Sequence, residues 1–197
     1  MFDRWLRGFS ILELVLIGLV AALGIATKPI VVPLVHILTG PLFIPGGAVA
    51  GGFYMLWIVL GAGLVKRRGA GTVIALTQAL MVVVLGIYGT HGIVSILTYS
   101  LPGVAVDVVF ACSRDHRYTA LHYFLAGALA NVTGTLSVNW VFFRLPLIPL
   151  LLTLSAALLS GGLGGLIAQA VARRFFAMNL LKNRRDRHEE DDMSHEG

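Results

Sequence analysis

Asp107 is the residue of this sequence whose chemistry is most constrained by its neighbours. It lies within the apolar stretch GVAVDVVFA, from Gly103 to Ala111. A carboxylate among apolar residues at membrane depth is costly unless it is paired or hydrated. We therefore predict that Asp107 faces other helices, either as a contact for a ligand or in a structural hydrogen bond or ion pair with His122 or Arg114.

Aromatic and amide side chains form the second group of candidates. Rings that stack and amides that hydrogen-bond suit a planar, polar, heteroaromatic ligand. Aromatic residues are also common at both surfaces of a membrane, where they need no ligand. Besides Asp107, the candidate ligand contacts are Tyr54, Trp57, Gln78, Tyr88, His91, Tyr99, Asn131, Asn139 and Trp140.

Motifs for catalysis or for metal binding are not found in the sequence. It has no HExxH, no GxSxG, no phosphate-binding lysine loop and no spaced cluster of carboxylates, histidines or cysteines, and Cys112 is its one cysteine. The basic residues fall in short clusters rather than along a face interleaved with aromatics, so nucleic acid is not an expected partner. We predict no enzyme, no catalytic residues, no cofactor and no metal site.

The composition indicates that these polar residues are held by membrane helices. Apolar residues make up 57% of the chain and charged residues 13%, with a mean hydropathy of +0.84. A soluble domain carries about a quarter charged residues. Since a bilayer crossing needs about 20 apolar residues, the runs between charge clusters predict an all-α bundle of six transmembrane helices, near 11–29, 46–65, 72–89, 93–112, 119–142 and 148–172.

The charges between these runs predict the orientation. With a cytoplasmic N-terminus, thirteen of the fifteen lysines and arginines lie inside, and only Lys28 and Arg144 lie outside. This asymmetry follows the positive-inside rule. An even number of spans also places the C-terminus in the cytoplasm. We expect a membrane domain over residues 1–172 and a polar, partly disordered cytoplasmic tail over residues 173–197.

The first external connection, at about residues 30–45, is rich in proline, glycine and apolar residues. It predicts an ordered loop or a broken helix that lies against the bundle. Such a segment could act as a lid over a binding site, or it could be a linker with no gating role.

Small residues recur every four positions in the first span, at Gly18, Ala22 and Ala26. This spacing places them on one helix face, which another helix can approach closely. The partner helix could belong to the same chain or to another protein.

Taken together, these features resemble the substrate-binding S-components of energy-coupling factor (ECF) vitamin transporters. These are six-helix membrane proteins with an external first loop and an Ala-xxx-Ala face on their first helix. The resemblance extends from Gly18 through the sixth span, and Ala22 and Ala26 match the face that docks on the transmembrane coupling subunit. It implies a subunit in a prokaryotic plasma membrane that captures a vitamin outside, with a coupling subunit and two ATPase subunits as partners.

Three segments are most similar to the thiamine and hydroxymethylpyrimidine branch of that family. They are GPLFIPGGAVAGGFYMLW (Gly40 to Trp57), VLGIYG (Val84 to Gly89) and VDVVFACSR (Val106 to Arg114). Asp107 stands where that branch carries a glutamate, and an aminopyrimidine could donate hydrogen bonds to such a carboxylate. The resemblance therefore implies thiamine or hydroxymethylpyrimidine as substrate. The alternative is a membrane scaffold or assembly subunit whose polar residues only fasten helices together.

Overall fold

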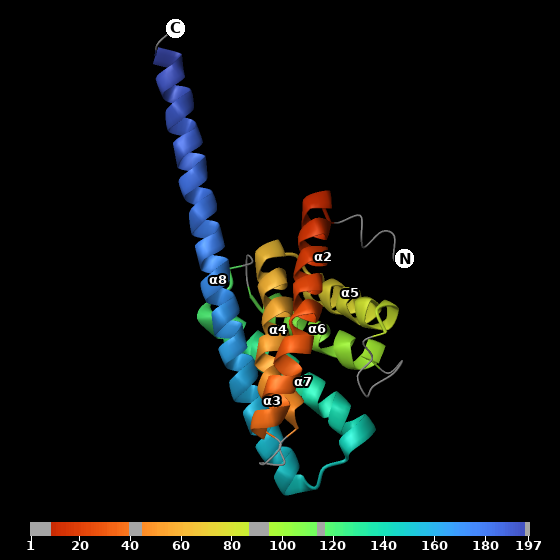
Figure 1. Ribbon diagram of the computed structural model, residues 1–197. Helices are drawn as coiled ribbons and strands as arrows, with labels where there is room; N and C mark the ends of the chain where they lie inside the picture. The colour runs from red at the N-terminus through yellow and green to blue at the C-terminus, as the bar shows by residue number, and fades with distance from the viewer. Residues whose placement is uncertain (1–8, 40–44, 87–94, 114–116, 196–197) are drawn as a thin grey trace.

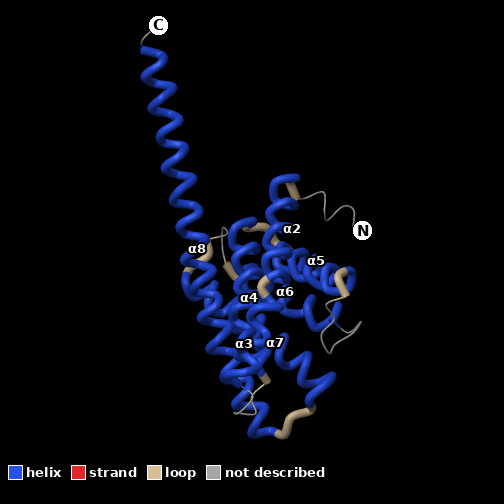
Figure 2. The backbone as a smooth tube through the Cα atoms, in the orientation of Figure 1, coloured by secondary structure: helices blue, strands red, loops and turns tan. Residues whose placement is uncertain are grey.

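The computed structural model describes residues 9–39, 45–86, 95–113 and 117–195, and every element in these ranges is helical (Figures 1 and 2). Five of the predicted spans correspond to α2 (Ile11–Ala26), α4 (Gly46–Val65), α5 (Ala70–Val84), α6 (Ser95–Ala111) and α7 (Ala120–Val138). A π-helix (Asn139–Phe143) continues α7, and the sixth span lies in α8 (Leu147–His195). The prediction of an all-α bundle is confirmed.

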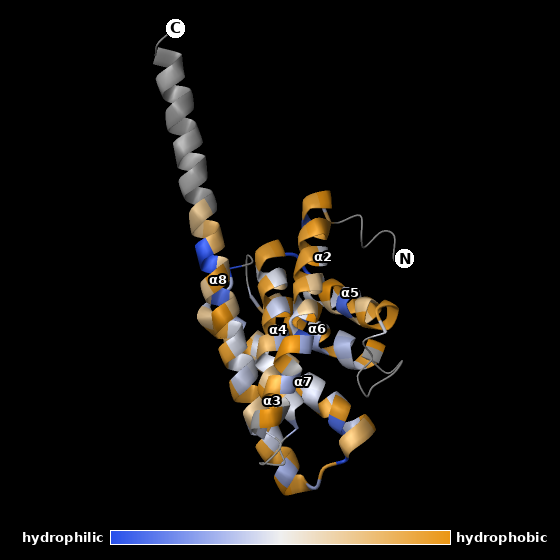
Figure 3. Ribbon diagram, in the orientation of Figure 1, coloured by the Kyte–Doolittle hydropathy of each residue, from blue (hydrophilic) through white to orange (hydrophobic). Residues whose placement is uncertain are grey.

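Apolar composition along these helices fits a membrane protein. Three stretches are long and apolar enough to cross a bilayer, namely Ile11–Val35, Gly46–Val65 and Leu147–Met178, while Ala70–Val84 and Ile96–Ala111 are shorter apolar helices. Hydrophobic residues are found along all the helices of the bundle in Figure 3, and many large hydrophobic side chains are exposed. Ile11 and Leu12, for example, are 83% and 80% exposed. Such a surface is stable in lipid but not in water.

The first external connection begins with a helix of its own. Thr27 ends α2, and α3 (Lys28–Thr39) follows at once with Pro33 inside it. The predicted forms of this connection were an ordered loop and a broken helix, and residues 28–39 adopt the second. Residues 40–44 lie outside the described part of the chain.

Local signals explain where several helices begin and end. Ser10 and Glu13 form a capping box at the start of α2, and Glu13 also pairs with Arg67 at 2.7 Å. Lys66 ends α4 in the left-handed conformation, with φ of 53°. Gly69, with φ of 86°, then turns the chain into α5. This turn holds the start of α2, the end of α4 and the start of α5 together.

Helix α8 lies against α4 and α7 and then extends beyond the bundle (Figure 1). It continues through residues 173–195, where we predicted a partly disordered tail. The reason is compositional, because glycine and proline are absent from residues 166–195 and most residues there favour helix. The boundary at residue 172 stays a prediction.

Candidate ligand-binding site

Lys28 and two tyrosines form the centre of the candidate site. The Lys28 ammonium lies 3.6 Å from the ring centroid of Tyr99 and 5.3 Å from that of Tyr54. The three residues come from α3, α4 and α6, so the first external connection, the second span and the fourth span meet here. The ring faces stabilise the ammonium by cation–π attraction.

Trp57 and Gln78 lie near Gly24, four residues before Lys28, and carry buried donors without partners. Trp57 Nε1 and Gln78 Nε2 are both buried and make no hydrogen bond with any described residue, and Gln78 is 3% exposed. A Cβ added at Gly24 would overlap Gln78 Nε2 and would lie 3.3 Å from Trp57 Cβ. Gly24 lies four residues before Lys28. Because Gly24 has no side chain, Gln78 and Trp57 can occupy the space beside it.

We call Lys28, Tyr54, Trp57, Gln78 and Tyr99 the Lys28 cluster. Among the residues whose side chains the structure describes, no carboxylate pairs with Lys28: Glu13 pairs with Arg67, and Asp107 accepts from Gly71 and Thr72. The nitrogen atoms Lys28 Nζ, Trp57 Nε1 and Gln78 Nε2 are all hydrogen-bond donors by type. A buried donor without an acceptor costs about 1–3 kcal/mol. The arrangement therefore suits a ligand with acceptor atoms on a flat ring.

Asp107 belongs to α6 and lies outside the cluster. Its side chain contacts the start of α5. Its two oxygens accept hydrogen bonds from the backbone amides of Gly71 and Thr72, at 2.9 and 2.7 Å, and from the Thr72 hydroxyl at 2.5 Å. Amides in the first turn of a helix have no partner within that helix, and a carboxylate satisfies them well. This bonding corresponds to the predicted structural alternative, with partners on α5 in place of His122 or Arg114. We leave Asp107 out of the proposed site.

Three further candidates have surroundings that indicate structural roles and not contact with a ligand. Asn131 is 2% exposed and donates to the backbone oxygens of Ala48 and Ala157, at 2.9 and 2.8 Å, so it joins α7 to α4 and α8. Asn139 Oδ1 accepts from the Leu145 amide at 2.9 Å and holds the turn that follows α7. Trp140 is 82% exposed, as expected for a residue at the membrane surface. Tyr88 and His91 lie outside the described residues.

No helix in the described part of the chain covers the small-residue face of α2. Ala22 and Ala26 are exposed, and a Cβ added at Gly18 would meet nothing within 4 Å. Val20, Ala21 and Gly24, on the opposite side of α2, are buried. Of the two predicted neighbours for this face, a helix of another protein agrees better with this exposure.

Sequence reasoning missed Lys28, which we had treated only as one of two external charges. The available signal was a lone cation between the first apolar run and an apolar loop. An amphipathic lysine in that place can bury its stem while its ammonium seeks rings or anions.

Comparison with known proteins assigns the chain to a family. The family model for the permease component of an ABC-type cobalt transport system matches residues 12–133. The chain belongs to this family. The matched region includes the small-residue face, the whole Lys28 cluster, Asp107 and Asn131. Membership confirms the prediction of a membrane transport component rather than an enzyme.

The fold of this family member is shared with a solved structure described as "Crystal structure of an S-component of ECF transporter". The TM-score is 0.74 at 22% sequence identity, over 92% of this chain and 98% of the other. No curated protein matches the chain in sequence. The likeness therefore extends over the whole bundle, from α2 into α8.

Proposed function

We propose that this protein is the substrate-binding S-component of an ECF transporter in a prokaryotic plasma membrane. Its substrate would be a small water-soluble vitamin or precursor, and hydroxymethylpyrimidine or thiamine fits best. The Lys28 cluster is the observation that carries the proposal. It combines two tyrosine rings with donors that have no acceptor among the described residues, in the half of the bundle that the charge asymmetry places outside.

The chemistry of the cluster favours a pyrimidine. Its two ring nitrogens accept hydrogen bonds, and its flat face suits the tyrosine rings. The Lys28 ammonium repels cations, so we expect neutral hydroxymethylpyrimidine to bind better than thiamine, which carries a positive thiazolium ring. The same repulsion acts against Co²⁺, the metal in the family's description.

Capture and transport would use separate parts of the molecule. The Lys28 cluster would bind the substrate outside, with α3 and the residues after it as the closing segment. The face formed by Gly18, Ala22 and Ala26 would dock on a transmembrane coupling subunit. Two ATPase subunits would drive reorientation of the whole S-component through that coupling subunit.

The test is the thermal stability of the full chain in detergent with a panel of ligands. The panel contains hydroxymethylpyrimidine, thiamine, riboflavin, biotin, folate and Co²⁺. A ligand at 100 times its dissociation constant adds about 2.7 kcal/mol to the free energy of unfolding. We expect a selective shift with hydroxymethylpyrimidine and a smaller one with thiamine.

Two tryptophan variants make this test specific. Trp57→Phe removes the buried donor, and we expect it to weaken substrate binding about tenfold, or 1.4 kcal/mol. Trp140→Phe is the matched control, since Trp140 is exposed on the bundle surface. Equal effects of the two variants would argue against the Lys28 cluster as the site. A folded protein that responds to no organic ligand would favour the scaffold alternative, and a response to Co²⁺ alone would replace the vitamin with a metal.

A further inference from the structure

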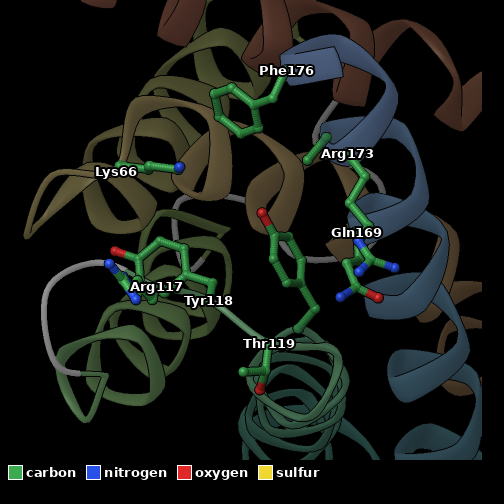
Figure 4. A pocket seen from close by; sticks show the side chains of 9 residues that line it. Lys66, Arg117, Tyr118, Thr119, Gln169, Arg173 and Phe176 are labelled. Atoms are coloured by element: carbon green, nitrogen blue, oxygen red, sulfur yellow. The ribbon is translucent and has the colours of Figure 1, made fainter. Parts of the chain in front are cut away.

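A second site lies at the opposite end of the bundle. A cavity of about 340 Å³ opens between the end of α4, the segment before α7 and the cytoplasmic part of α8. Figure 4 shows its labelled side chains, with Lys66 and Arg117 on one side and Arg173 and Gln169 of α8 on the other. Lys66 lies 12 residues after Tyr54 of the Lys28 cluster, which corresponds to about 18 Å along α4.

Three cations from different parts of the chain line this cavity. Lys66, Arg117 and Arg173 contribute positive charge, and the described residues that line the cavity include no carboxylate. Thr119, which caps α7, also lines the cavity, and the positive end of that helix dipole adds to the field. Groups of one charge sign in a concave, partly apolar site concentrate ions of the opposite sign. The cavity therefore favours an anion.

Each of these cations lies at the end of an apolar span. Lys66 follows α4 directly, Arg117 lies three residues before the start of α7, and Arg173 lies near the end of the apolar part of α8. Phe176 forms an apolar wall, and its ring centroid lies 4.1 Å from the Lys66 ammonium. A site with cations at the end of its helices and an apolar wall lies at the depth of the lipid phosphates.

We propose that this cavity binds the phosphate group of an anionic phospholipid in the cytoplasmic leaflet. Lys66, Arg117 and Arg173 neutralise the headgroup charge, and the Gln169 side-chain amide donates hydrogen bonds to its oxygens. Phe176 packs against the glycerol and the start of an acyl chain. The bound lipid sets the depth of the cytoplasmic end of the bundle in the membrane. The site is separate from the proposed vitamin site and does not depend on it.

Binding to phosphatidylglycerol, with phosphatidylcholine as reference, tests this proposal in the detergent-purified full chain. Lipid retention is measured by native mass spectrometry and by the shift in melting temperature. We expect Arg117→Gln and Arg173→Gln to weaken phosphatidylglycerol binding about fivefold each, since one cation near an anionic headgroup contributes about 1 kcal/mol. Arg173→Lys keeps the charge and should restore most of the binding.

Arg174→Gln is the matched control, because Arg174 is exposed on the same turn of α8 but does not line the cavity. Unchanged melting temperatures in phosphatidylcholine establish that the variants fold. If Arg174→Gln lowers binding as much as Arg173→Gln, general surface charge explains it and the proposal is overturned. Equal binding of both lipids would overturn it too. Inorganic phosphate or glycerol phosphate that displaces the lipid at millimolar concentration would show a site for soluble phosphate instead.

Discussion

Asp107 illustrates how a buried carboxylate can be held by backbone groups instead of by a counter-charge. Its oxygens bind the amides of Gly71 and Thr72 and the Thr72 hydroxyl, so α6 closes the first turn of α5. A ligand that approached Asp107 would compete with these three bonds. The residue type indicated a buried partner, but the identity of that partner depends on how α5 and α6 pack.

Asp107→Asn separates the structural role from the ligand role. The variant replaces one acceptor by an NH₂ group, which cannot accept from Thr72, and we expect a loss of about 1–2 kcal/mol in the free energy of unfolding. Substrate affinity should stay within about twofold, a change of 0.4 kcal/mol. The melting temperature and the dissociation constant, measured on the same sample, check both parts. A tenfold weaker affinity with unchanged stability would return Asp107 to the binding site.

At the scale of helices, glycine sets how closely α8 approaches its neighbours. A Cβ on Gly127 of α7 would overlap the Gly161 carbonyl oxygen of α8, and a Cβ on Gly164 would overlap the Gly52 carbonyl oxygen of α4. Ser160 uses the same close approach to accept from the Gly52 amide at 3.0 Å. Close backbone contact between small residues is a main source of helix association in lipid.

Gly127→Val and Gly18→Val give a direct test of this packing. We expect Gly127→Val to destabilise the bundle by about 1–3 kcal/mol, since the side chain meets backbone that cannot move away. Gly18→Val is the control within the same chain, because a Cβ added at Gly18 would meet nothing within 4 Å. Melting temperatures in detergent measure both. Similar losses of stability would mean that the exposed face of α2 is covered.

At the scale of the whole molecule, α2 has one face in the bundle and one face free. The free face is the expected contact with a coupling subunit, whereas Gly24, which borders Trp57 and Gln78 of the Lys28 cluster, is buried on the opposite side of α2. Binding and transport are therefore separable by substitution. A bulky residue at Ala22 or Ala26 should prevent docking without reaching the cluster.

Ala22→Trp and Ala26→Trp are accordingly expected to abolish cellular uptake while substrate affinity of the purified protein changes by less than about twofold. Leu23→Trp is the control, since Leu23 is also exposed but is large and lies outside the small-residue face. Uptake of labelled substrate and its dissociation constant are the two measurements. If all three variants transport normally, docking uses another surface.

The sequence by itself determined the all-α membrane bundle, the approximate positions of its six spans and its small-residue face, because apolar run length and residue spacing act along the chain. It also singled out Tyr54, Trp57, Gln78 and Tyr99, which the structure places together. Only the tertiary structure decided that Lys28 joins them, that Asp107 binds α5 and that Asn131 joins α7 to α4 and α8. These contacts depend on how each helix is rotated and shifted against its neighbours, and that is set by packing between residues far apart in sequence.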